Sequence, residues 1–185
     1  MIRATFATVL VLAVPALGRA QPLPGRAERA EDRRELRHDR RELREDFRNL
    51  AWIDRIIYDY DAARTSRDRA ALARVEDEAT RALAREVQEA RVELAKSRDE
   101  VRRDAYEGRE RRDDRRDLRD DRRDLRRVVA IDEEFESLRG RMDRRALDRK
   151  RSLLVQLRRM AKAEFREDRR ELREDRRALR DDYRR

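Results

Sequence analysis

Apolar residues recur every three, four or seven positions along residues 72–101, which is the spacing of a single helix face. The residues in that row are Leu72, Val75, Ala79, Leu83, Val87, Ala90, Leu94 and Val101. All three prolines lie before residue 25, and after Gly25 the only glycines are Gly108 and Gly140. A chain so poor in helix breakers is expected to form long helices.

Local signals divide the chain into four predicted helical segments. The first runs from about residue 27 to residue 63, and Thr65–Asp68 resembles a capping box that opens the second. Gly140 is a candidate C-terminal cap for the third segment, and Asp143 is a candidate N-terminal cap for the fourth.

The predicted fold is all-α, with two antiparallel long-helix hairpins at residues 28–107 and 108–185. A turn at Gly108 would give an elongated four-helix arrangement, whereas a chain that stays helical there would make one long rod. The segments 67–74 and 142–149 resemble each other, which indicates two related hairpins.

A charged unit of seven residues, D-R-R-E-L-R-x, is repeated at residues 32–46, 114–127 and 168–182. Winding it on a helix separates the signs into stripes with a leucine row between them. In the first copy the acidic stripe is Asp32, Glu35, Asp39 and Glu42, and the basic stripe is Arg33, Arg37, Arg40 and Arg44. Like charges three and four residues apart destabilise a lone helix, so the repeat is expected to pack weakly on a neighbour. In isolation it could instead be disordered.

Charge counting disfavours a nucleic-acid arm. Residues 28–48 hold 8 arginines and 8 acids, so the cations that phosphate binding needs are already compensated. The whole chain has 52 basic and 43 acidic residues, a formal net charge of +9.

The basic excess is concentrated at residues 139–151. This segment, named the basic turn below, is a candidate site for an anionic envelope polymer or an envelope protein, and its alternative is a solvated turn. Its candidate residues are Arg139, Arg141, Arg144, Arg145, Arg149, Lys150 and Arg151.

An apolar cluster lies near the predicted hairpin turns. Core packing is the favoured interpretation, and the alternative is an exposed patch that holds client proteins. The candidate patch residues are Trp52, Ile56, Tyr60 and Phe135.

The N-terminus has the pattern of a secretory signal peptide. An arginine precedes an apolar run over residues 4–17, which Pro15 interrupts, and Gly18-Arg19-Ala20 fits a cleavage site. We predict a signal peptide at residues 1–20, a flexible linker at 21–27, and a mature chain without a transmembrane segment, located in the periplasm or outside the cell. The chain has no cysteine, so it forms no disulfide.

Catalytic constellations are missing from the sequence. The single histidine, His38, lies inside a charged repeat, and one imidazole alone makes neither a triad nor a metal site. We therefore expect no enzyme, cofactor or metal. The favoured hypothesis is an exported bacterial envelope protein that binds or chaperones envelope components through charged helix faces. The alternative is a structural spacer that self-associates like a coiled coil, a homo-oligomer held by the charged repeats.

Overall fold

The computed structural model describes residues 26–107 and 112–182, and these residues form four long helices, which confirms the all-α prediction. The predicted signal peptide, linker residues 21–25 and Gly108 lie outside the described residues. The helices are α1 (Arg26–Ser66), α2 (Arg69–Glu107), α3 (Arg112–Ser137) and α4 (Arg144–Asp182).

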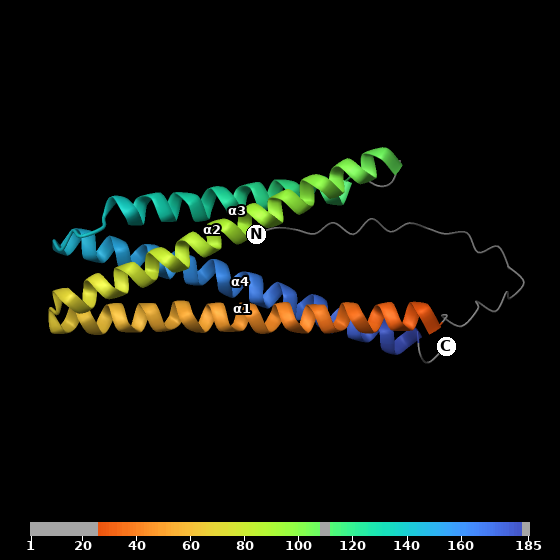
Figure 1. Ribbon diagram of the computed structural model, residues 1–185, viewed down its shortest axis with the longest axis horizontal. Helices are drawn as coiled ribbons and strands as arrows, with labels where there is room; N and C mark the ends of the chain where they lie inside the picture. The colour runs from red at the N-terminus through yellow and green to blue at the C-terminus, as the bar shows by residue number, and fades with distance from the viewer. Residues whose placement is uncertain (1–25, 108–111, 183–185) are drawn as a thin grey trace, which may run out of the picture.

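The helices lie in two antiparallel pairs, α1 with α4 and α2 with α3 (Figure 1). The α1–α2 and α3–α4 turns are at the same end, where all four helices meet, and the pairs diverge toward the other end. Because α2 and α3 lie side by side, the protein has the four-helix arrangement rather than the rod. The charged repeats of α1, α3 and α4 all lie toward the divergent end.

The turn between α1 and α2 differs from its predicted form. Arg67 adopts a left-handed conformation with φ 54°, which ends α1 without a glycine. The carboxylate of Asp68 accepts the N–H of Ala71 at 2.9 Å and caps α2. The prediction that Thr65 opens this helix was wrong, because its hydroxyl donates back to a carbonyl of α1 at 2.8 Å.

The turn between α3 and α4 follows the prediction. Gly140 has φ 72°, a conformation that favours glycine, and Asp143 caps α4 by accepting the N–H of Ala146 at 3.0 Å. Asp68 and Asp143 hold matching positions in the two similar segments noted above. The two halves of the chain therefore start their returning helices in the same way.

The hydrophobic core fills the turn end of the bundle and receives side chains from all four helices. Tyr60 is fully buried there, and its hydroxyl donates to the carbonyl oxygen of Leu147 at 3.0 Å. Burying one large aliphatic side chain contributes about 1.5–3 kcal/mol, so this end holds most of the stability. The core includes Ile53, Ile56, Tyr60, Leu72, Val75, Ala79, Leu83, Val128, Ile131, Phe135, Leu153, Leu154 and Leu157.

A buried ion pair ties α2 and α4 to the second turn. Lys150 and Glu76 are almost fully buried, and the lysine Nζ lies 2.5 Å from Glu76 Oε1. The ammonium also donates to the carbonyl of Arg141 at 2.8 Å, and the Gly140 N–H donates to Glu76 Oε2 at 3.1 Å. Lys150 therefore does not face the surface, although the sequence placed it among the candidates for binding an anion.

We predict that replacing Lys150 with Met lowers the free energy of unfolding by about 3–5 kcal/mol, because it leaves Glu76 buried without a counter-charge. Urea unfolding measures this loss. The double variant Glu76→Leu/Lys150→Met is expected to recover most of it. Arg55→Met is the control, since its pair with Asp59 is exposed and its loss costs at most about 1 kcal/mol. A similar loss in Lys150→Met and Arg55→Met would contradict the prediction.

Candidate functional site: an acid-lined cleft between the helix pairs

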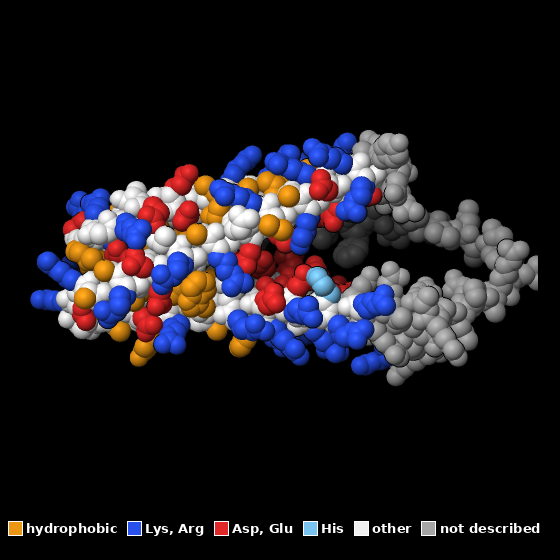
Figure 2. All heavy atoms as spheres, viewed as in Figure 1, with side chains coloured by type: hydrophobic (Ala, Val, Ile, Leu, Met, Phe, Trp, Pro, Cys, Tyr) orange, Lys and Arg blue, Asp and Glu red, His pale blue; other side chains and the backbone are white. Residues whose placement is uncertain are grey.

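A hollow of about 780 Å³ opens where the two helix pairs separate, and residues of all four helices line it. Figure 2 shows acidic side chains gathered in this hollowed region, with basic side chains over much of the outer surface. Three arginines and twelve carboxylates line the hollow, which we call the acidic cleft. The carboxylates are Glu42, Glu45, Asp46, Glu86, Glu89, Glu93, Asp121, Asp124, Glu164, Glu167, Asp168 and Glu171.

The charged repeat explains why acids line this cleft. In α1 the acidic residues Asp39 and Asp46 are half-buried, while Arg37, Arg40 and Arg44 of the basic stripe are exposed. Glu42, between the two aspartates, is exposed and lines the cleft. The described acids of this stripe therefore turn toward the neighbouring helix or the cleft, and the described arginines of the basic stripe turn toward solvent.

The leucine rows of two repeats face each other across the α1–α4 pair. Leu172 of α4 is buried and Leu43 of α1 is half-buried. Next to this seam, the rings of Phe47 and Phe165 lie 6.0 Å apart between centroids, tilted by 48°. The repeat of α1 thus pairs with the repeat of α4 in the same chain, whereas the repeat of α3 lies on α2.

Two carboxyl groups meet across the seam, from Asp46 of α1 and Asp168 of α4. Burial, the hydrogen bond to Asp168 and the charges of Asp168, Glu164 and Glu42 together raise the pKa of Asp46 to about 8, with burial as the largest cause. A hydrogen bond between two carboxyl groups needs a shared proton, so this pair is protonated once at neutral pH. Asp46 Oδ2 is buried without a hydrogen-bond partner among the described residues.

Glu164 belongs to the same group of acids and is more exposed than Asp46 or Asp168. It keeps contact with solvent, but the surrounding walls desolvate it and raise its pKa to about 7, with help from the charges of Glu86 and Asp168. Burial also raises the pKa of Glu86, and a hydrogen bond from the Asn49 amide opposes that rise. The cleft therefore holds carboxylates that repel one another and outnumber the arginines among them.

The cleft arginines do not remove this surplus. Arg85 donates to Glu89 at 2.7 Å within α2, and Arg127 donates to Asp124 at 3.1 Å within α3. Each pair lies along one helix wall. Three arginines against twelve carboxylates leave a strong negative potential in the cleft.

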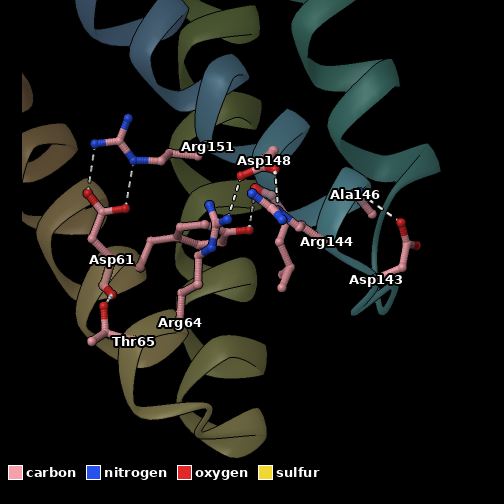
Figure 3. Close-up of polar contacts among 10 residues, drawn as sticks. Asp61, Arg64, Thr65, Asp143, Arg144, Ala146, Asp148 and Arg151 are labelled. Carbon is pink, nitrogen blue, oxygen red and sulfur yellow. Dashed lines mark hydrogen bonds and ion pairs between the residues drawn. The ribbon is translucent and has the colours of Figure 1, made fainter.

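The basic turn is already compensated by acids, some within the turn segment itself and some on the other helices. Arg151 binds Asp61 of α1 through two nitrogens at 2.7 and 2.9 Å, and Arg149 binds Glu134 of α3 in the same way (Figure 3 shows the first). Six of the seven candidate residues form an ion pair with a carboxylate, and Arg145 is the one without such a pair among the described contacts. The six are Arg139, Arg141, Arg144, Arg149, Lys150 and Arg151.

The apolar patch candidates lie mostly inside the protein. Ile56, Tyr60 and Phe135 are fully buried, so their side chains pack the core. Trp52 is half-buried beside a second, smaller hollow of about 330 Å³. The acidic cleft was not predicted from the sequence, because its acids form one surface only when the four helices come together.

Within the part of the chain that the structure describes, no helix is long and apolar enough to span a membrane. Comparison of the chain with protein-family models, with curated proteins and with solved structures gave no match. The cleft and its charge therefore carry the functional argument.

We predict that stability falls as pH rises from about 5 to 8. The pKa of Asp46 is about 8 in the folded protein against an ordinary 3.8, so folding favours its protonated form; this contribution is full below 3.8, declines as pH rises and is gone once pH has passed through 8. Asp46→Asn keeps a donor for Asp168 and is expected to flatten the decline and to raise the unfolding temperature at pH 9. Thermal unfolding followed by circular dichroism measures both effects.

Asp99→Asn is the control for this experiment, since its carboxylate is exposed at the surface and lies outside the cleft. Glu134 and Asp143 have lowered pKa values, so their opposite pH dependence lies at acid pH, below this window. Identical slopes for Asp46→Asn and the unaltered protein between pH 5 and 8 would rule out the shared proton.

A charge reversal in the basic turn is expected to affect stability. Arg151→Glu removes the two-nitrogen pair with Asp61 and sets two carboxylates together, which costs about 1 kcal/mol for a half-exposed site. Arg145→Glu, which breaks no such pair, is expected to stay within about 0.5 kcal/mol of the original. Urea midpoints of the two variants measure the difference, and equal midpoints contradict it.

Proposed function

We propose that the protein is an exported, non-enzymatic component of the bacterial cell envelope that binds a basic segment of another envelope protein in its acidic cleft. One observation carries the proposal. The chain has a formal net charge of +9, yet twelve carboxylates and three arginines line the hollow between its helix pairs.

This inversion of charge favours selective capture of a cation. Arginines on the outer faces of the helices repel a basic partner, while the walls of the cleft attract it. Walls of one sign around a hollow concentrate the field and raise the local concentration of the opposite charge. A basic segment is therefore drawn to the cleft rather than to the surface as a whole.

The shape of the cleft supports an extended segment as the occupant. Its volume is within the range of small-molecule sites, but such sites are mostly apolar. The few apolar residues on its walls, Ala90, Val128, Met160 and Ala163, are outnumbered by carboxylates. Carboxylates placed along four helices suit successive lysine or arginine side chains of a peptide.

The structure offers a charged cleft for a basic partner, but it offers no apolar patch for the capture of apolar clients among the described residues. Three of the four apolar patch candidates are buried in the core. Large exposed apolar side chains are scattered, with Phe47 59% exposed, Tyr58 74% and Val92 43%. Single exposed apolar residues are normal on soluble surfaces and form no holding patch.

The chemistry of the cleft supports a binding role rather than a catalytic one. Its lining includes no serine, threonine, cysteine or histidine. The Asp46–Asp168 pair shares a proton, as catalytic carboxyl pairs do. However, Asp46 Oδ2 is buried within the α1–α4 seam, which leaves that oxygen no access to a reacting water.

We predict that a fluorescent peptide of ten alternating lysine and alanine residues binds the protein and is released by salt. Neutralising Glu89, Glu167 and Glu171 to glutamine is expected to weaken binding by about tenfold, since three screened contacts of about 0.5 kcal/mol each are lost. Fluorescence anisotropy at low and high salt measures the affinity.

The control carries the same change of charge outside the cleft, as Asp99→Asn, Glu133→Gln and Glu174→Gln. Equal weakening in both triple variants would mean that the peptide follows net charge alone and would sink the cleft proposal. Sedimentation at the same two salt concentrations tests the alternative of self-association, which salt-sensitive oligomers would favour. Recovery of the protein from the cytoplasm with residues 1–20 attached would contradict export.

A further inference from the structure

The described part of the chain brings three metal-ligating side chains together on α1. His38, Asp39 and Glu42 each offer a ligand atom, and these atoms all lie within 4.8 Å of one another. His38 Nδ1 lies 3.1 Å from Glu42 Oε2, one helical turn away. This trio, which we call the α1 trio, takes no part in the Asp46–Asp168 pair.

We propose that the α1 trio binds a divalent transition metal of the zinc class. An imidazole nitrogen with two carboxylate oxygens is a ligand set that zinc accepts, whereas calcium and magnesium prefer oxygen alone. Positions one turn apart on a helix face the same way, so His38 and Glu42 can hold one ion between them. Three protein ligands leave at least one further position for water.

The histidine changes the chemistry of an otherwise uniform repeat. It stands at the seventh position of its unit, where other units have Glu45, Asp120 and Glu174. A histidine in place of an acid at this position puts one nitrogen donor beside the acidic stripe, next to Asp39. One histidine alone makes no metal site, but here the acidic stripe supplies the oxygen ligands, Asp39 and Glu42.

The position of the α1 trio allows an ion to enter from solvent. The side chains of His38 and Glu42 are 66% and 51% exposed, so binding needs no opening of the fold. Glu42 also lines the acidic cleft, whose negative potential raises the local concentration of cations. Figure 2 shows the one histidine of the chain, in pale blue, beside acidic side chains.

Zinc titration of the purified full chain, made without a polyhistidine tag, tests the proposal. Calorimetry is expected to detect one zinc ion per chain, and His38→Gln or Glu42→Gln to weaken its affinity at least about tenfold. Because the chain has one histidine, its single imidazole signal in the proton NMR spectrum reports directly on coordination. That signal is expected to shift on addition of zinc and not of calcium.

Glu45→Gln is the matched control, since it alters the seventh position of the next unit and leaves the α1 trio intact. Its zinc affinity is expected to stay within about twofold of the original, and circular dichroism checks the helix content of every variant. Equal zinc binding by His38→Gln and the original chain would place the ion among other carboxylates and overturn the proposal. An imidazole signal that does not respond to zinc would overturn it as well.

Discussion

The distribution of apolar residues along the helices is the constraint on which the rest of the structure depends. A helix that packs into a bundle needs roughly three apolar positions in seven. The turn halves of the helices meet that need and form one core. The charged repeats supply one leucine in seven, which suffices for a seam between two helices and not for a core among four. The two pairs therefore separate where the repeats begin.

The turn end must then hold all four helices in place. Glu76 and Lys150 contribute here by linking α2 to α4 and to the backbone of the second turn. Burying such a pair is costly, and hydrogen bonds to Gly140 and to the Arg141 carbonyl offset part of that cost by satisfying the remaining donors and acceptors. Ion pairs of the basic turn add screened attractions around it. Because the turn end is fixed in this way, it determines the angle at which the two helix pairs diverge toward the charged repeats.

Much of the fold was predictable because it depends on local rules. The length of the helices followed from the lack of proline and glycine. The helix caps at Gly140 and Asp143 could be predicted from the residues next to them in the sequence. The cap of α2 was predicted at Thr65 instead of Asp68. The hydroxyls of Thr65 and Ser66 can hydrogen-bond either to the helix that follows or to the turn before them, and in the structure they donate to carbonyls of α1. The burial of Lys150 was missed because its partner lies on another helix, 74 residues away in sequence. The cleft was missed for the same reason.

The acids of the cleft also have a structural effect. A leucine at Asp46 and another at Asp168 would widen the apolar part of the seam and bury more apolar surface. Carboxyl groups at these positions instead share one proton and leave Glu164 and Glu86 to repel each other. Mutual repulsion across the cleft opposes closure of the pairs, and an incoming cation would relieve it. The feature that keeps the cleft open is therefore the same one that would favour a basic occupant.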